Sequence, residues 1–322
     1  MTRRYVMEFE RPLAELETKL EELRRLDLAQ NPELVHEVDE LTAGIERLRE
    51  STYGTLSAWE KVQVSRHPDR PKTQDYIETL CTDVIELHGD RAFGDDEAIV
   101  AALATIGGVR TVVLGHRKGK DTRENIKRNF GMVHPEGFRK AIRAMHLAER
   151  FGLPIVTFID TPGAYPGIEA EERGQAWAIA EALSVLSGVQ VPVVCVGIGE
   201  GGSGGALAIG FGDRLIMLEN SYYSVISPEA CASILHKDAG KAAEMAGCLA
   251  LTAEDLVELG IVDEVVPEPL GGAHRDPGAV MSAVRERVLG ALGALAAAEP
   301  AAIAERRYER LRRIGVIAGD VG

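Results

Sequence analysis

A glycine-rich turn between a buried strand and a helix is the stretch of this sequence best suited to chemistry. Residues 191–198 form an apolar, β-branched run, short enough for a buried strand. Six glycines fall between Gly197 and Gly205, and the small apolar residues 206–209 then begin a helix. The first N–H groups of a helix lack intrahelical partners, and glycine lets a substrate oxygen approach them closely. The stretch therefore predicts an anion site or oxyanion hole made of main-chain N–H groups.

Other interpretations of this turn compete with the oxyanion hole. A phosphate-binding P-loop needs Lys and then Ser or Thr after its last glycine, whereas this turn continues with Ala206. A serine-hydrolase elbow, G-x-S-x-G, is matched by residues 201–205, with Ser203 as the nucleophile. Acid and histidine candidates follow in the hydrolase order: Asp213, His236 and His274. Such a match arises easily by chance among so many glycines, but a serine hydrolase stays an alternative.

A second strand–turn–helix unit precedes this one and presents its turn on the same side. Residues 154–160 read as a buried strand, residues 161–167 as a turn rich in glycine and proline, and residues 169–186 as a helix. Ligands of parallel α/β sheets collect at the carboxyl ends of the strands, where such turns lie. Tyr165 and Pro166 are therefore candidates for lining a ligand pocket, although a packed turn explains them equally well.

Charge is distributed unevenly along the chain. The sequence has 36 Lys and Arg against 50 Asp and Glu, and this net charge of −14 argues against nucleic acid as a primary partner. Residues 116–150 nevertheless contain ten Lys and Arg against four Asp and Glu. A basic stretch in an acidic protein suits a small anionic ligand or an acidic partner. We expect Lys118, Lys120 and Arg128 to bind the substrate there.

Length and composition place the chain among large globular proteins. Its 322 residues, 45% of them hydrophobic, can bury one large domain plus additions. Its first residues lead into a charged helical pattern rather than a signal peptide, and no apolar run approaches the roughly 20 residues that span a bilayer. The cysteines, at positions 81, 195, 231 and 248, form no C-x-x-C pair. We therefore expect a cytoplasmic protein with no metal site and no membrane partner.

The remaining segments supply the elements that position these turns. Residues 12–50 predict two helices broken at Asn31-Pro32, an αα-hairpin better suited to subunit contact than to a site. A helix over residues 73–87 follows a proline-containing linker, and residues 98–106 and 111–115 pair as a hairpin. The other expected elements are a binding loop with a short helix (117–135), a helix (135–151), strands (213–218 and 222–226), a helix and strand (251–266) and a helical tail.

Five motifs carry a resemblance to a known family. They are Arg128-Asn-Phe-Gly-Met, Phe158-Ile-Asp-Thr-Pro-Gly-Ala-Tyr-Pro-Gly, Gly199-Glu-Gly-Gly-Ser-Gly-Gly-Ala-Leu-Ala-Ile, Ser224-Val-Ile-Ser-Pro-Glu and Pro267-Glu-Pro-Leu-Gly-Gly-Ala-His-Arg. These motifs resemble the α subunit of bacterial acetyl-CoA carboxylase carboxyltransferase, and the match covers nearly the whole chain. The resemblance implies an α/β fold of the crotonase-like (ClpP/crotonase) type, a superhelix of ββα units. It further implies an N-terminal helical hairpin (1–55) and a carboxyltransferase domain (56–322), with its core at about 72–270 and a helical tail over 271–322.

The same resemblance implies an enzyme that transfers a carboxyl group from carboxybiotin to acetyl-CoA, forming malonyl-CoA in the first committed step of fatty acid synthesis. This chemistry needs no triad or metal if carboxybiotin releases CO₂ and the biotin ureido nitrogen takes the acetyl α-proton. The protein must then stabilise enolate-like oxygens. We expect the backbone of Gly204, Gly205 and Ala206 to donate the hydrogen bonds, with Gly201 and Gly202 shaping the approach. The resemblance implies that the oxyanion hole of this subunit stabilises the ureido oxygen of biotin.

The sequence also indicates what other subunits must supply. It contains no Ala-Met-Lys-Met biotinylation motif and no ATP-binding loop. Biotin is therefore expected on a biotin carboxyl carrier protein, with ATP used only by a separate biotin carboxylase. The resemblance implies a zinc-ribbon β subunit that forms an α2β2 complex with this chain and without which the chain is inactive. Another crotonase-like acyl-CoA enzyme, such as a hydratase, stays an alternative and would need a carboxylate beside the hole, for which Glu200 is the nearest candidate.

Overall fold

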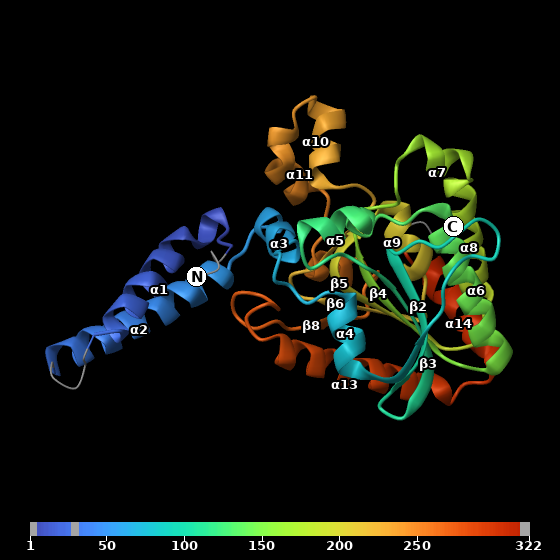
Figure 1. Ribbon diagram of the computed structural model, residues 1–322, viewed down its shortest axis with the longest axis horizontal. Helices are drawn as coiled ribbons and strands as arrows, with labels where there is room; N and C mark the ends of the chain where they lie inside the picture. The colour runs from blue at the N-terminus through green and yellow to red at the C-terminus, as the bar shows by residue number, and fades with distance from the viewer. Residues whose placement is uncertain (1–4, 27–31, 316–322) are drawn as a thin grey trace, which may run out of the picture.

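A mixed β-sheet forms the centre of the molecule, and helices cover both of its faces (Figure 1). The computed structural model describes residues 5–26 and 32–315. Within these residues the sheet has eight strands, in the order β1-β2-β3-β4-β5-β6-β8, and β7 pairs with β5. Their bounds are β1 (Cys81–Glu86), β2 (Ile99–Ile106), β3 (Val109–His116), β4 (Ile155–Thr161), β5 (Val193–Gly202), β6 (Arg214–Leu218), β7 (Tyr222–Ser224) and β8 (Glu264–Val266).

The direction of the strands brings distant segments to one edge of the sheet. β2 and β3 form the predicted antiparallel hairpin, which turns at Gly107-Gly108, where both residues have positive φ. From β3 onward, β4, β5, β6 and β8 run parallel to their neighbours. Because parallel strands end at the same edge, the carboxyl ends of β3, β4 and β5 lie next to one another.

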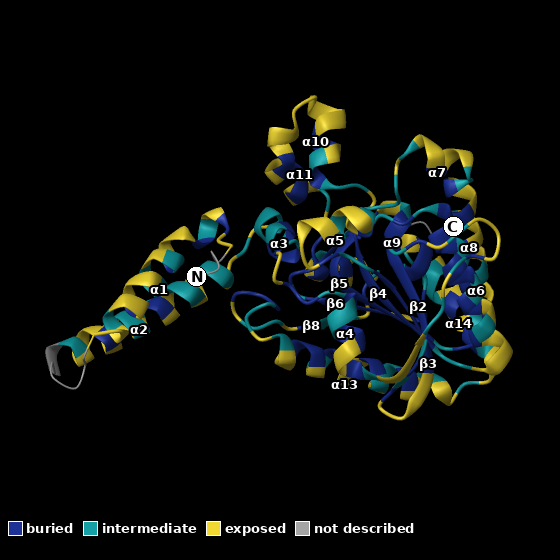
Figure 2. Cartoon of the chain, in the orientation of Figure 1, coloured by how far each residue is buried: buried dark blue, intermediate teal, exposed yellow. Residues whose placement is uncertain are grey.

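Alternate side chains of the strands point to opposite faces of the sheet and pack into two separate hydrophobic cores. On one face, α6 (Pro135–Phe151), α8 (Gln175–Gly188) and α9 (Ser203–Gly210) pack into a cluster that includes Val112 and Leu114 of β3. On the other face, α4 (Thr73–Leu80) and α13 (Pro277–Ala296) pack on a cluster that includes Val113. This two-sided burial explains why the central strands are continuous apolar runs, and Figure 2 shows them buried between the helical layers.

The N-terminal helices form the predicted hairpin. α1 (Arg11–Arg24) and α2 (Pro32–Tyr53) pack on each other around a small apolar cluster of Leu13, Leu20, Val38 and Ile45. Asn31, where the sequence predicts the break between them, lies outside the described residues. The domain boundary at residue 55 stays a prediction. The shorter helices are α3 (Ala58–Ser65), α5 (Thr122–Lys127), α7 (Ile168–Glu172), α10 (Pro228–His236), α11 (Ala242–Cys248) and α12 (Ala253–Glu258).

Two predicted helices have different extents in the structure. The prediction of one helix over residues 73–87 is wrong, because α4 ends at Leu80 and the β-branched segment that follows is the edge strand β1. β1 is exposed on both sides and contains a register shift, so it lacks the alternating pattern that indicates a strand. The helix predicted over residues 169–186 is two helices, since Gly174, with φ of 81°, separates α7 from α8.

The helical C-terminal portion consists of α13 and α14 (Pro300–Arg312). Arg307 fastens α14 to the core: its buried guanidinium donates to Asp213 at 2.8 and 3.0 Å and to the carbonyls of Leu186, Val189 and Val191. None of the described helices is by itself long and apolar enough to cross a membrane. α13 and α14 pass that test of length and composition only as a pair, and the pair is bent by 117°.

Candidate active site

The glycine turn between β5 and α9 lies directly against the turn that follows β4. A Cβ placed on Gly202 would stand 2.1 Å from the carbonyl oxygen of Pro162. A Cβ on Gly205 would stand 2.5 Å from both the carbonyl carbon of Gly163 and the nitrogen of Ala164. Real Cβ atoms do not approach backbone atoms this closely, so the contact between the two turns requires glycine at both positions.

The first turn of α9 faces open space. Ser203 is exposed and Gly204 half-buried, whereas Gly205 and Ala206 are buried. In a helix that begins at Ser203, the N–H groups of residues 203–205 have no intrahelical acceptor, and the N–H of Ala206 is the first that reaches back to Gly202. A Cβ on Gly163 would meet nothing within 4 Å, and one on Gly204 would meet only methyl groups of Ile179, at 3.6 and 3.7 Å. The two turns therefore border open space at Gly163 and at the exposed Ser203.

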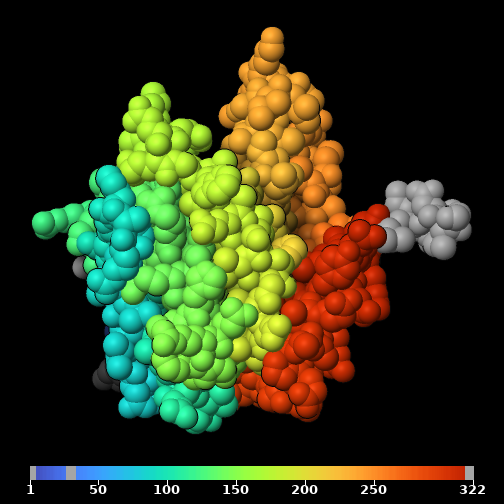
Figure 3. Space-filling model, turned by 90° about the vertical axis from the view of Figure 1, so that its right-hand side faces the viewer, coloured from blue at the N-terminus to red at the C-terminus, as the bar shows by residue number. Residues whose placement is uncertain are grey.

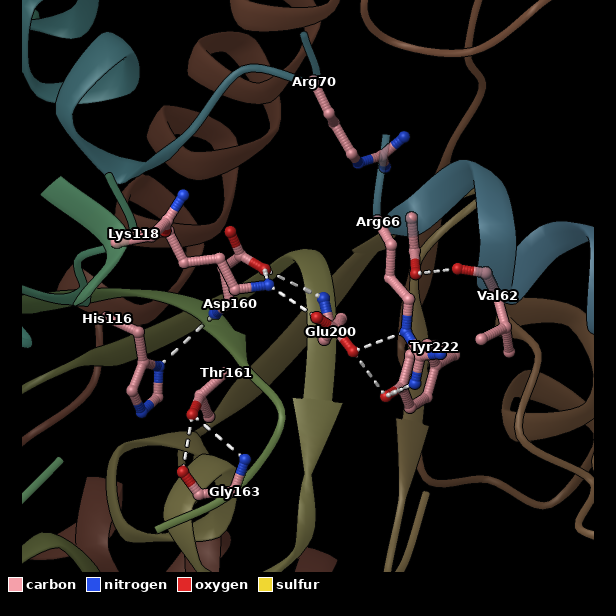
Figure 4. Close-up of polar contacts among 12 residues, drawn as sticks. Val62, Arg66, Arg70, His116, Lys118, Asp160, Thr161, Gly163, Glu200 and Tyr222 are labelled. Carbon is pink, nitrogen blue, oxygen red and sulfur yellow. Dashed lines mark hydrogen bonds and ion pairs between the residues drawn. The ribbon is translucent and has the colours of Figure 1, made fainter. Parts of the chain in front are cut away.

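Beside the turns, a cluster of charged side chains is buried at the carboxyl ends of β4 and β5 (Figure 4). The Lys118 ammonium lies 2.7 Å from Asp160 Oδ1 and 2.7 Å from Glu200 Oε1. Glu200 also accepts hydrogen bonds from Arg66 Nε at 2.7 Å and from the Tyr222 hydroxyl at 2.9 Å. Arg66, at the end of α3, additionally pairs with Glu229 of α10. The cluster thus connects the linker, the sheet and α10.

The charges of this cluster are fixed. Burial alone would raise the pKa of Glu200, but the charges of Lys118 and Arg66 outweigh it and lower the pKa to about 2. Burial likewise opposes the charged form of Lys118, yet Asp160 and Glu200 raise its pKa above the ordinary value. Glu200 is therefore ionised at neutral pH and its oxygens are already engaged, which makes it a poor general base for a hydratase.

His116, at the end of β3, connects the cluster to the first turn of α9. Its Nδ1 lies 3.3 Å from the Asp160 N–H nitrogen, and its Nε2 lies 3.1 Å from the carbonyl oxygen of Gly205. The ring is fully buried. Burial lowers the pKa of His116 to about 4, even though the neighbouring carbonyls of Gly205 and Phe158 favour the protonated ring. His116 is consequently neutral at physiological pH.

A cavity of about 540 Å³ opens above the cluster. Lys118 and Lys120 line it, as do Arg66, Lys72, Phe130 and Pro162. Lys120 is exposed and pairs with Asp75 at 2.8 Å, whereas Lys118 is held by its two carboxylates. Arg128 is not among the lining residues, and it braces the loop by donating to the Lys118 carbonyl at 3.2 Å and to Glu124 at 3.1 Å. Of the predicted basic residues, Lys120 is therefore the one best placed to meet an anion from solvent.

Tyr165 and Pro166 lie in the turn after β4, apart from that cavity. The Tyr165 ring stacks on His134, with 4.1 Å between ring centroids, and its N–H donates to the Val133 carbonyl. Pro166 is exposed. Both residues thus belong to the turn that touches the glycine turn, and Gly201, Gly202 and Gly205 are brought to the same place.

Sequence reasoning did not single out Asp160, His116 or Arg66. Asp160 and His116 each stand at the carboxyl end of a strand, and a polar residue at that point of a predicted buried strand is the signal that identifies such positions. Arg66 follows α3 in a linker whose local pattern gives no such signal. Its role depends on Glu200, 134 residues further along the chain.

The structure does not bring the hydrolase candidates together. Ser203 is exposed with φ of 53°, a strained conformation that a nucleophile elbow also uses. Asp213, however, accepts from the N–H of Val193 at the opposite end of the ten-residue strand β5, roughly 30 Å away at about 3.3 Å per residue. His274 stacks on His67, with 3.7 Å between centroids. Residues 5–26 and 32–315 also contain no group of three or more Asp, Glu, His or Cys side chains arranged to hold a metal ion.

A solved structure with a similar fold defines the fold class. The transcarboxylase 12S core, crystallised with methylmalonyl-coenzyme A and methylmalonic acid, matches with a TM-score of 0.58 at 19% identity. The match covers 70% of this chain and 41% of that chain. Together with the sheet and the helical C-terminal portion, it shows an α/β protein of the crotonase-like fold, as expected.

Sequence comparisons are more specific. The family model described as acetyl co-enzyme A carboxylase carboxyltransferase-like matches residues 6–315. The acetyl-coenzyme A carboxylase carboxyl transferase subunit alpha of Thermus thermophilus is 53% identical over 312 residues, which are 97% of this chain and 99% of that protein. The corresponding subunit of Thioalkalivibrio sulfidiphilus is 54% identical over 309 residues, 96% of this chain and 97% of that protein. The chain belongs to the family of acetyl-CoA carboxylase carboxyltransferase alpha subunits, and it is a transferase subunit of that complex.

Proposed function

We propose that this alpha subunit provides the biotin side of the active site and that the glycine turn is its oxyanion hole. The observation that supports the proposal most is the contact between the two turns, which places the start of α9 at the carboxyl ends of β4 and β5 beside open space. A helix start at such a place concentrates N–H donors and positive partial charge.

Each part of the site then has a task. Carboxybiotin supplies the carboxyl group for acetyl-CoA and a nitrogen that can take up the acetyl proton. The backbone of Gly204 and Gly205 donates hydrogen bonds to the developing negative oxygen, with Ala206 as a weaker candidate because its N–H can bond within the helix. Because Gly201 and Gly202 have no side chains, they leave room for the oxygen to approach the N–H groups. Removal of one such donor typically costs about 10²–10³ in kcat.

Biotin is proposed to enter along the turn after β4, where Tyr165 and Pro166 line its path. It arrives on the biotin carboxyl carrier protein after a separate biotin carboxylase has used ATP. The exposed basic loop around Lys120 suits an acidic partner or the phosphates of a CoA substrate, with Lys118 and Arg128 fixing its position from below. This work is proposed to take place in the cytoplasm.

The β subunit is proposed to cover the hollow above the glycine turn. Figure 3 shows α7 and the α10–α11 pair rising on either side of this hollow. Large apolar side chains on and next to these helices are each more than two-thirds exposed, as is typical of a surface that a partner covers. They are Ile168 of α7, Trp177 at the start of α8, Val225 in the loop before α10, and Ile234 and Leu235 of α10. An α2β2 assembly with a zinc-ribbon β subunit would complete the site.

The proposal is tested by comparing the purified chain with its complex. The alpha chain and the β subunit are produced separately and together, and decarboxylation of malonyl-CoA is measured in the presence of free biotin. Activity is expected for the complex and not for either chain alone, because each holds half of the site. Malonyl-CoA turnover by the alpha chain alone would contradict the proposal.

Replacement of Ser203 separates this function from the hydrolase alternative. Ser203→Ala is expected to retain activity within about 3-fold in the complex, whereas loss of a serine nucleophile costs several orders of magnitude. The variant is assayed for carboxyl transfer and, with wild type, for labelling by a fluorophosphonate. Covalent labelling at Ser203 would favour the hydrolase.

A further inference from the structure

The imidazole of His116 joins three parts of the chain through both of its nitrogens. On one side Nδ1 faces the backbone N–H of Asp160 in β4, at 3.3 Å. On the other side Nε2 faces the carbonyl of Gly205 in α9, at 3.1 Å. An amide N–H can only donate and a carbonyl can only accept, so the neutral ring carries its proton on Nε2 and donates it to Gly205. A residue at the end of β3 thereby holds the first turn of α9.

The other end of the glycine turn is fixed as well. The N–H of Glu200 donates to Asp160 Oδ1 at 3.1 Å, and the Glu200 carboxylate is held by Lys118 and Arg66. Between Glu200 and Gly205 the chain is almost entirely glycine and would otherwise sample many conformations. An oxyanion hole stabilises a transition state only if its donors are already in position. Fixing both ends of the turn limits this freedom.

We propose that His116 is a positioning residue for carboxyl transfer, which fixes the Gly205 carbonyl and with it the direction of the N–H groups in the first turn of α9. The proposal rests on the oxyanion role of that turn. His116 is fully buried and does not line the cavity, so it acts through Gly205 rather than on the substrate.

Two amide substitutions distinguish the two contacts of the ring. In His116→Asn, the side-chain oxygen takes the place of Nδ1 and can accept from Asp160, but the amide nitrogen does not reach Gly205. In His116→Gln, the longer side chain brings an N–H donor to the position of Nε2. The Gly205 carbonyl can still accept a hydrogen bond within the helix, so it keeps a partner in the asparagine variant, and the variant is expected to fold.

The variants are compared as complexes with the β subunit. His116→Asn is expected to lower kcat for malonyl-CoA decarboxylation by about 10- to 100-fold, the scale of a displaced catalytic group. KM is expected to stay within about 3-fold, because the loss concerns the transition state. His116→Gln is expected to restore kcat to within about 3-fold of wild type. Hydrogen exchange of a peptide covering residues 200–208 is expected to be faster in the asparagine variant and near wild type in the glutamine variant.

Each other outcome overturns the proposal. Equal kcat in both variants and wild type excludes a positioning role, as does faster exchange in His116→Asn without a loss of kcat. An equal loss in both variants shows that the donor to Gly205 is not what matters. Hydrogen exchange needs no activity, so it decides the contact to Gly205 even if the wild-type complex transfers no carboxyl group, a result that would instead count against the proposed function.

Discussion

Gly205→Ala is expected to lower kcat of the complex by about 100-fold or more, because its methyl group must push the two turns of the site apart. The new Cβ would stand 2.5 Å from the backbone of Gly163 and Ala164, where no flexible side chain can move away. Displacing a catalytic group by about 1 Å can cost about 100-fold in rate. Malonyl-CoA decarboxylation by the variant complex measures the effect, and thermal unfolding is expected to show destabilisation by about 1–3 kcal/mol.

Gly204→Ala is the matched control, one residue away in the same helical turn. Its Cβ makes only ordinary contacts with Ile179, at 3.6 and 3.7 Å, and its φ is not positive. Alanine in place of a helical glycine stabilises by roughly 0.5–1 kcal/mol, so this variant is expected to be at least as stable as wild type. Residue 204 keeps its backbone N–H in this variant, so we expect its kcat to stay within about 10-fold of wild type. This kcat is expected to be far higher than that of Gly205→Ala. Equal behaviour of the two alanine variants would show that the turns do not meet as described.

Replacing Gly205 with a residue larger than alanine is a less informative experiment. Gly205→Val adds atoms beyond a Cβ that already collides with the neighbouring turn. The sequence suggests that a side chain here would obstruct the oxyanion while leaving the strand–helix unit folded. The structure shows that position 205 packs against the backbone of the turn after β4, so loss of activity in the valine variant would not separate obstruction from misfolding.

The two turns of the site could be predicted from the sequence because their signals are local. Each follows an apolar, β-branched run that reads as a buried strand, and parallel strands end at the same edge of a sheet. The close approach of the turns could not be predicted, since it depends on the stagger of β4 against β5 and on a register shift between Ile159 and Thr161. The high glycine content of the turn follows from that contact, because side chains at Gly202 and Gly205 would collide with the neighbouring turn.

The charged cluster shows the limit of local reasoning more plainly. Lys118 lies in a basic stretch and reads as a solvent-facing cation, yet its partner Glu200 is 82 residues away along the chain. Charge patterns report composition within a segment, whereas burial depends on which segments the sheet brings together. The edge strand β1 was missed for a related reason, because its pairing with β2 rather than its own pattern defines it.

Lys118 and Lys120 are therefore expected to respond very differently to the same substitution. Lys118→Met removes the cation between Asp160 and Glu200 and leaves two buried carboxylates sharing one site. Breaking a buried ion pair on one side costs about 3–5 kcal/mol, so we expect a large loss of stability and of activity. Lys120→Met breaks one exposed pair with Asp75, which is worth at most about 1 kcal/mol. Thermal unfolding of each complex measures the difference.

The pH dependence of stability identifies why Lys118→Met destabilises the protein. In the wild type, the pKa of Glu200 is lowered from its ordinary value of 4.5 to about 2. The ionised carboxylate therefore stabilises the folded state above pH 4.5, and this stabilisation is lost as the pH falls toward 2. Without Lys118 the pKa of Glu200 rises, so the folded variant can take up a proton there, which relieves the repulsion from Asp160. The stability difference between wild type and Lys118→Met is therefore expected to narrow between pH 7 and pH 5. A difference that stays constant with pH would mean that lost packing, rather than unbalanced charge, destabilises the variant.

Lys120→Met then isolates the docking role of the basic loop. Because its fold is expected to be intact, a change in its kinetics reports on the anionic partner. We expect a higher KM for the CoA substrate or the biotin carrier and an unchanged kcat, with added salt producing the same defect in wild type, since exposed charges are screened within about 8–10 Å at physiological ionic strength. An unchanged KM at low salt would assign Lys120 to its surface pair with Asp75 alone. Lys118→Met does not answer this question, because it also removes the cation that holds Asp160 and Glu200 together, so a change in its kinetics could follow from the lost stability.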